Sequence, residues 1–146
     1  MTSEKRETNL GMIEKVHDHI IDELDTNTRT DLIFVLTGII LNLIILGVNS
    51  AIAGSHGGGA ENTVFYALVL LLLILNIVVE VGLLRGRDTR KKLLEGILKM
   101  YKDQGVEGYY DPSLLGDYRL RYNLFMLVVL AFGLTALIIP FALRLL

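Results

Sequence analysis

The 146-residue chain contains no cysteine, no tryptophan and only two prolines. Without cysteine it cannot form disulfides, bind zinc or an iron–sulfur cluster through thiolates, or use a thiol as a nucleophile. The sequence also lacks a phosphate-binding glycine loop, a His-Glu-x-x-His motif, a nucleophile elbow and a dinucleotide-binding fingerprint. We therefore expect a protein that is not an enzyme and that carries no metal ion or other cofactor.

The sequence also lacks the features of a cleavable secretory signal and of a nucleic-acid-binding protein. The first thirty residues are too polar to contain the apolar core of a secretory signal, so we expect the mature chain to begin at or near Met1. The basic residues lack interleaved aromatic stacking positions and adjoin a long apolar stretch, which is not the pattern of a nucleic-acid-binding protein.

What the chain does have is long apolar stretches, at residues 32–53, 64–84 and 124–143. Each is close to the ~20 residues that a helix needs to cross the hydrocarbon core of a bilayer. Hydrophobic residues make up 52% of the chain. Because lipid offers the backbone no hydrogen-bond partners, each stretch must be helical. The sequence therefore predicts an all-α integral membrane protein with three transmembrane helices.

The distribution of Lys and Arg predicts the orientation, since loops on the cytoplasmic side carry an excess of these residues. Residues 54–63 contain none, whereas basic residues gather between the second and third stretches: Arg85, Arg87, Arg90, Lys91, Lys92, Lys99, Lys102, Arg119 and Arg121. We expect an inner or plasma membrane protein that crosses it three times, with its N-terminus in the cytoplasm and its C-terminus outside.

This topology divides the chain into six segments. We expect an N-terminal amphipathic cytoplasmic helix at residues 1–27, a first span at 28–53 and a short external glycine-rich loop at 54–62. A second span at 63–85, a basic cytoplasmic helical loop at 86–119 and a third span at 120–146 follow.

Residues 10–25 place apolar side chains at helical spacing on one face and an acidic row (Glu14, Asp18, Asp22, Asp25) along another. Interfacial helices usually carry basic polar faces, so we expect this helix to dock on the basic segment of the protein itself. The acidic row would pair there with basic residues, or would be solvated. His17 and His19 point in different directions on a helix, form a poor metal site and are expected to be solvated.

Several sequence signals predict where helices begin and end. Thr28 and Asp31 read as a capping box that starts the first span. Asn62 or Thr63 is expected to cap the second helix, which should continue beyond the membrane through Tyr101 and break at residues 105–108. Asp111 followed by Pro112 suits the start of the third helix.

Three asparagines lie inside the long apolar stretches. Asn42 and Asn49 share one face of the first span, and Asn76 lies near the middle of the second. Such a stripe should face protein or water. One interpretation is structural, with amides hydrogen-bonded between helices; the other is a pore or substrate pathway that the amides line.

Glu80 is the only ionisable residue well inside a span, one turn from Asn76. A lone carboxylate in lipid should find a partner, and Arg121 at the start of the third span is the best candidate. The pair would fix the helix register. Alternatively, Glu80 side chains from several copies would surround a cation or proton path.

The basic segment offers a contact surface for partner proteins or for anionic lipid headgroups. Its candidate residues are Arg87, Arg90, Lys91, Lys92, Lys99 and Lys102.

These observations support two hypotheses. The first is a non-enzymatic membrane protein that assembles into a homo-oligomer, because three helices leave no room for a channel in one copy, with an ion or proton path lined by Asn42, Asn49, Asn76 and Glu80. The alternative is an accessory or scaffold subunit of a larger membrane complex that docks partners through its cytoplasmic helices. A third, weaker hypothesis is a sensor of anionic lipids.

Overall fold

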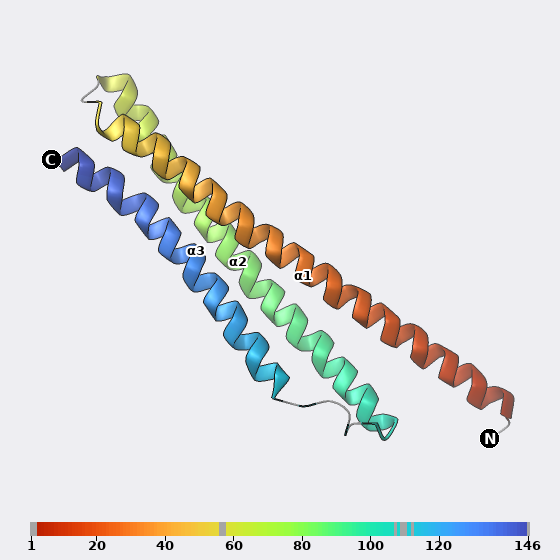
Figure 1. Ribbon diagram of the computed structural model, residues 1–146. Helices are drawn as coiled ribbons and strands as arrows, with labels where there is room; N and C mark the ends of the chain where they lie inside the picture. The colour runs from red at the N-terminus through yellow and green to blue at the C-terminus, as the bar shows by residue number, and fades with distance from the viewer. Residues whose placement is uncertain (1–2, 56–57, 107, 109–110, 112, 146) are drawn as a thin grey trace.

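The computed structural model of the protein describes residues 3–55, 58–106, 108, 111 and 113–145. Its three long helices are α1 (Ser3–Ala53), α2 (Gly59–Asp103) and α3 (Leu114–Leu145). Helices α1 and α3 run in the same direction and α2 runs in the opposite one, so the two termini lie at opposite ends of the bundle (Figure 1). All three are long and apolar enough to cross a membrane, as the sequence predicts.

The buried face of each helix repeats at seven-residue spacing. The series is clearest in α2, where Phe65, Leu72, Val79 and Gly86 are all buried. In α3 the corresponding residues are Tyr122, Val129 and Ala136, and in α1 they include Asn42 and Asn49. A repeat of seven, 3.5 residues per turn, keeps one face of a helix against its neighbours when the helices supercoil left-handedly. The same repeat continues beyond the apolar stretches, so one packing pattern extends along the whole bundle.

Three apolar clusters fill the interior. Their buried members are Leu24, Leu94 and Ile97 at one end, Val35, Val79, Leu83 and Val129 in the middle, and Ile45, Leu72 and Ala136 toward the other end. Outward-facing positions of the spans are also apolar: Ile33, Ile77 and Leu127 have exposed fractions of 64%, 63% and 60%. An apolar surface all round suits contact with lipid rather than water.

Helix α1 is continuous, so the predicted capping box at Thr28 is wrong. The Thr28 hydroxyl donates to the carbonyl oxygen of Leu24 at 2.8 Å, as side chains do in the interior of a helix. Residues on both sides of Thr28 pack against α2 and α3, and this tertiary packing overrides the local capping signal.

The predicted cap of the second helix is also wrong, since α2 begins at Gly59, after Gly58. The Thr63 hydroxyl instead bonds to the carbonyl of Gly59 within the helix. At the other end α2 continues through Tyr101 to Asp103, as the helical pattern predicts, and Gly105 follows with a φ of 69°. Such a positive φ favours glycine.

The third helix begins at Leu114, after the predicted start. Asp111 accepts a hydrogen bond from the backbone N–H of Ser113 at 2.9 Å, and this bond lowers the pKa of the Asp111 carboxyl below its ordinary value. Pro112, the other part of the predicted start, lies outside the described residues.

The N-terminal part of α1 packs on the basic segment of α2, as the sequence predicts. Leu24 contacts the cluster of Leu94 and Ile97, and His17 Nε2 lies 3.1 Å from the Tyr101 hydroxyl, so His17 is half-buried rather than solvated. The expected pairing of the acidic row with the basic segment is not found. Among the described residues every ion pair lies within a single helix, as Arg29 with Asp25 does at 2.8 Å. The docking is therefore apolar rather than ionic.

Gly133 lets α2 approach α3 closely, and replacing it tests the packing. A Cβ on Gly133 would lie 2.7 Å from Cγ of Asn76, whereas a Cβ on Gly47 would meet nothing within 4 Å. We expect Gly133→Ala to lower the free energy of unfolding in detergent by about 1–3 kcal/mol, as overpacking does. Gly47→Ala, the matched control, should leave it unchanged or raise it. Equal effects of the two variants would contradict the described packing.

Candidate functional site: a polar junction at one end of the spans

One layer of polar residues joins the three helices where the apolar stretches end. We call Asn27 and Asp31 of α1, Gly86 of α2 and Tyr122 of α3 the polar junction. Asp31 directly precedes the first apolar stretch, Gly86 follows the second and Tyr122 precedes the third. Asp31 and Tyr122 are each only 4% exposed, so their polar atoms depend on partners within the protein.

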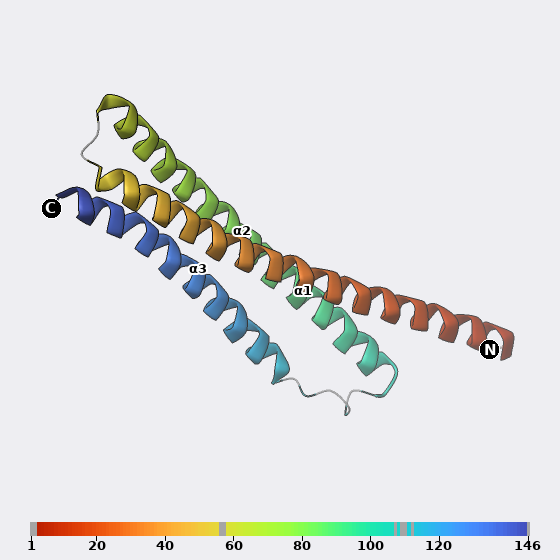
Figure 2. The same cartoon turned by 45° about the horizontal axis from the view of Figure 1, so that its top comes forward.

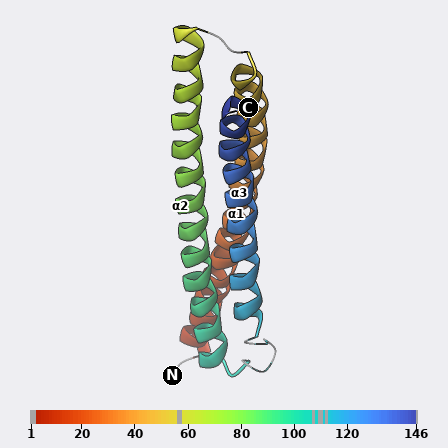
Figure 3. The same ribbon diagram turned by 90° about the vertical axis from the view of Figure 1, so that its left-hand side faces the viewer.

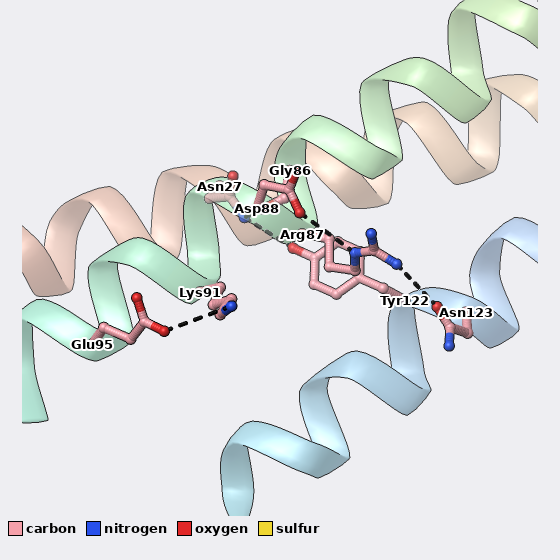
Figure 4. A network of polar contacts seen from close by, with 8 residues as sticks. All are labelled: Asn27, Gly86, Arg87, Asp88, Lys91, Glu95, Tyr122 and Asn123. Atoms are coloured by element: carbon pink, nitrogen blue, oxygen red, sulfur yellow. Dashed lines mark hydrogen bonds and ion pairs between the residues drawn. The ribbon is translucent and has the colours of Figure 1, made fainter.

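The Asn27 amide donates to groups on all three helices. Its Nδ2 lies 3.0 Å from Asp31 Oδ2, 3.2 Å from the carbonyl oxygen of Gly86 and 2.9 Å from the Tyr122 hydroxyl. Figure 4 shows Asn27 reaching across to Gly86 and Tyr122. The Tyr122 hydroxyl in turn donates to Asp31 Oδ2. The buried carboxylate thus receives hydrogen bonds from two side chains, one of them on another helix.

The positively charged side chains of Arg90 and Arg121 also attract the Asp31 carboxylate electrostatically. Arg90 Nη1 donates to the Thr28 hydroxyl at 2.6 Å, and the guanidinium lies 4.2 Å from the centre of the Tyr118 ring. Arg90 therefore contacts α1 and α3 at once. A buried carboxylate without such compensation would destabilise the fold by several kcal/mol.

Gly86 makes the close approach of α1 and α2 possible. A Cβ at this position would lie 3.0 Å from Cγ of Asp31 and nearer still to its Oδ1. A glycine within a helix costs about 1 kcal/mol relative to alanine. Here it exposes the carbonyl oxygen of the same residue to the Asn27 amide.

A cavity of about 390 Å³ lies between α2 and α3 beside the junction. Its walls include Arg87, Arg90, Lys91, Tyr118, Arg119 and Tyr122. Arg87 donates to Asn123 Oδ1 at 3.4 Å and pairs with Asp88 at 3.6 Å, and Lys91 pairs with Glu95 at 3.8 Å (Figure 4). The other three basic residues of the predicted docking surface, Lys92, Lys99 and Lys102, are exposed on α2.

Two of the predicted intramembrane residues meet in the middle of the bundle. Asn42 Nδ2 donates to Asn76 Oδ1 at 3.1 Å, and Asn76 Nδ2 donates to Asn42 Oδ1 at 2.9 Å. Asn76 also donates to the carbonyl of Leu72 at 2.8 Å. Asn42 is only 1% exposed. The pair joins α1 to α2 within one chain. This is the arrangement expected if the amides are hydrogen-bonded between helices and do not line a pore.

Asn49 has no such partner. It is fully buried, and neither amide atom makes a hydrogen bond within the described part of the chain. At the same end of the bundle Arg144 donates to Asn62 and lies 4.5 Å from the centre of the Phe65 ring. Contacts of this kind join the end of α3 to the start of α2.

Glu80 and Arg121 do not form the predicted ion pair within the described residues. Glu80 Oε1 is buried and has no hydrogen-bond partner there, whereas Arg121 is exposed and lies 5.3 Å from the centre of the Phe125 ring. The reason is the register of α3, in which Tyr122 occupies the buried position and its neighbour Arg121 is turned outward.

Sequence reasoning missed all four residues of the polar junction as partners. The sequence patterns place Asp31 only in a capping box and indicate no partner for Asn27, Gly86 or Tyr122. A signal was nevertheless present: Asp31 lies seven residues before Gly38, and Tyr122 lies seven before Val129. Extending the buried repeat out of the spans would have placed both residues in the interior.

The Tyr122 hydroxyl is the simplest group of the junction to remove. We expect Tyr122→Phe to lower the free energy of unfolding in detergent by about 1–3 kcal/mol, because Asp31 loses a buried donor and Asn27 an acceptor. Tyr66→Phe is a matched control, since Tyr66 is 57% exposed. Unchanged stability of Tyr122→Phe would refute the hydrogen-bond arrangement described above.

No family model matches the chain, and no curated protein or solved structure matches it significantly. Its function must therefore be inferred from its own residues.

Proposed function

We propose that the protein is a non-enzymatic accessory or scaffold subunit of a larger membrane complex. The observation that carries this proposal is the pairing of Asn42 with Asn76 at 2.9 and 3.1 Å inside one chain. Polar side chains that satisfy each other within a bundle stabilise it and do not need to line a water-filled path.

The part of α1 beyond the spans supports a docking role. Leu10, Met12 and Val16 have exposed fractions of 55%, 54% and 52%. Met12, Ile13 and Val16 form a shallow apolar groove with Met100 of α2. Apolar side chains exposed together outside the lipid-facing stretches are typical of a protein contact surface. Figure 2 shows this end of α1 extending past the neighbouring helices.

The bundle is also suited to present that surface rigidly. Helices α1 and α2 leave the spans without a break, and Leu24, Leu94 and Ile97 hold them together beyond the polar junction. Figure 3 shows α2 running alongside α1 and α3. A partner bound near Met12 would thus be held at a fixed position relative to the membrane.

The test is purification from the native membrane in mild detergent, followed by native mass spectrometry. We expect the protein to be recovered with foreign subunits. The double variant Met12→Gln, Val16→Gln should lose them while keeping its helical content. Lys15→Gln, a change to another exposed residue of the same segment, is the control and should retain them. A homo-oligomer free of other proteins would contradict the proposal.

A second candidate function is an ion or proton path through assembled copies. It is favoured by Glu80 Oε1 and the Asn49 amide, which are buried in the spans without partners among the described residues. In a bilayer such groups commonly mark ion or proton pathways.

Flux through liposomes reconstituted with the purified protein tests this second candidate. If the path exists, Glu80→Gln should reduce cation or proton flux by about tenfold or more, because the charge at the path is lost. Glu23→Gln changes an exposed carboxylate outside the spans and should leave flux unchanged. Absence of flux in the unaltered protein, or equal flux in Glu80→Gln, would exclude the candidate.

A further inference from the structure

The lining of the cavity between α2 and α3 carries a net positive charge. Four basic residues (Arg87, Arg90, Lys91, Arg119) and two acidic residues (Asp88, Glu95) line it, which leaves a formal charge of 4 − 2 = +2. Both acidic residues are already paired, Asp88 with Arg87 at 3.6 Å and Glu95 with Lys91 at 3.8 Å. Arg90 and Arg119 have no carboxylate partner in the lining, although Arg90 also acts electrostatically on the buried Asp31 carboxylate beside the cavity.

Arg90 keeps an unused donor at this cavity. Its Nη1 bonds to Thr28 and its plane lies over Tyr118, which together fix the guanidinium. Its Nε is buried and has no acceptor within the described part of the chain. A buried donor on a fixed cation is unfavourable unless an acceptor reaches it. Arg119 is exposed on the facing wall and makes no hydrogen bond or ion pair with the described residues.

Counted along α2 from the end of the second apolar stretch, the cavity begins at the depth expected of lipid headgroups and extends slightly past it. Arg87 and Arg90 follow Leu84, the last residue of the second apolar stretch, by about 5 and 9 Å at ~1.5 Å per helical residue. The headgroup layer extends about 5–8 Å beyond the hydrocarbon core on each side. Tyr118 and Tyr122, which also line the cavity, have the amphipathic rings common at this depth.

We propose that this cavity binds the phosphate group of an anionic phospholipid, with Arg90 and Arg119 as its principal donors. Arginine suits phosphate oxygens because its planar donors can bond two of them at once. The net positive lining favours a lipid that carries a net negative charge over a zwitterionic one. The proposal does not depend on the proposed function, since an accessory subunit or a conducting oligomer would hold the lipid equally.

The experiment adds lipid to the purified, delipidated full-length protein in neutral detergent. Phosphatidylglycerol should raise the melting temperature and remain bound in native mass spectra, as a ligand of the folded state does. Phosphatidylcholine and inorganic phosphate at the same concentration should do neither. Stabilisation by inorganic phosphate alone would overturn the assignment to lipid, and equal effects of the two lipids would overturn the selectivity for an anionic headgroup.

Matched variants locate the site. Arg119→Gln removes an exposed wall residue and should weaken phosphatidylglycerol binding roughly tenfold, the effect of losing one charge-assisted hydrogen bond. Arg90→Gln should weaken it at least as much, although it also removes the contact with Thr28. Arg85→Gln is the control, because Arg85 is exposed at similar depth but does not line the cavity. If Arg85→Gln weakens binding as much as Arg119→Gln, general surface attraction explains the binding and the proposed site is wrong.

Discussion

The arrangement of the bundle depends on one constraint: a polar side chain in an apolar interior destabilises the bundle unless a partner reaches it. Asn27 meets this constraint by bonding across to Gly86 and Tyr122, and Asn42 meets it by bonding to Asn76. Each of these bonds crosses between helices. Apolar side chains can slide past one another in lipid at little cost, whereas an unpaired amide or carboxylate cannot. The polar pairs therefore specify the register in which the helices pack.

Glycines at the helix contacts make these pairs possible. Gly86 lies against Asp31, and Gly133 lies against Asn76. At both positions a methyl group would occupy the space of the polar side chain. The seven-residue repeat brings each glycine to the interior, where the backbones approach closely. Polar contacts and close packing thus act at the same layers of the bundle.

The sequence predicts the three helices and the inward position of Asn42, Asn49 and Asn76. This is possible because the length of an apolar run is a local property, and so is the spacing of polar residues within it. The continuity of α1 through Thr28 could not, since the capping signal there is local while the packing that overrides it is not. The polar junction was missed for the same reason: Asn27 and Tyr122 are separated by 95 residues. The pairing of Glu80 with Arg121 was inferred from depth alone, which does not determine the side of α3 on which Arg121 lies.

The most direct test of the central claim is a double-mutant cycle on Asn42 and Asn76. Asn42→Val, Asn76→Val and the double variant are compared by the free energy of unfolding in detergent, at several ratios of protein to detergent. If the amides satisfy each other within one chain, the cycle should give a coupling energy of about 0.5–2 kcal/mol, the range of hydrogen bonds between membrane helices, independent of that ratio. A coupling of zero, or one that disappears as the protein is diluted, would contradict the account.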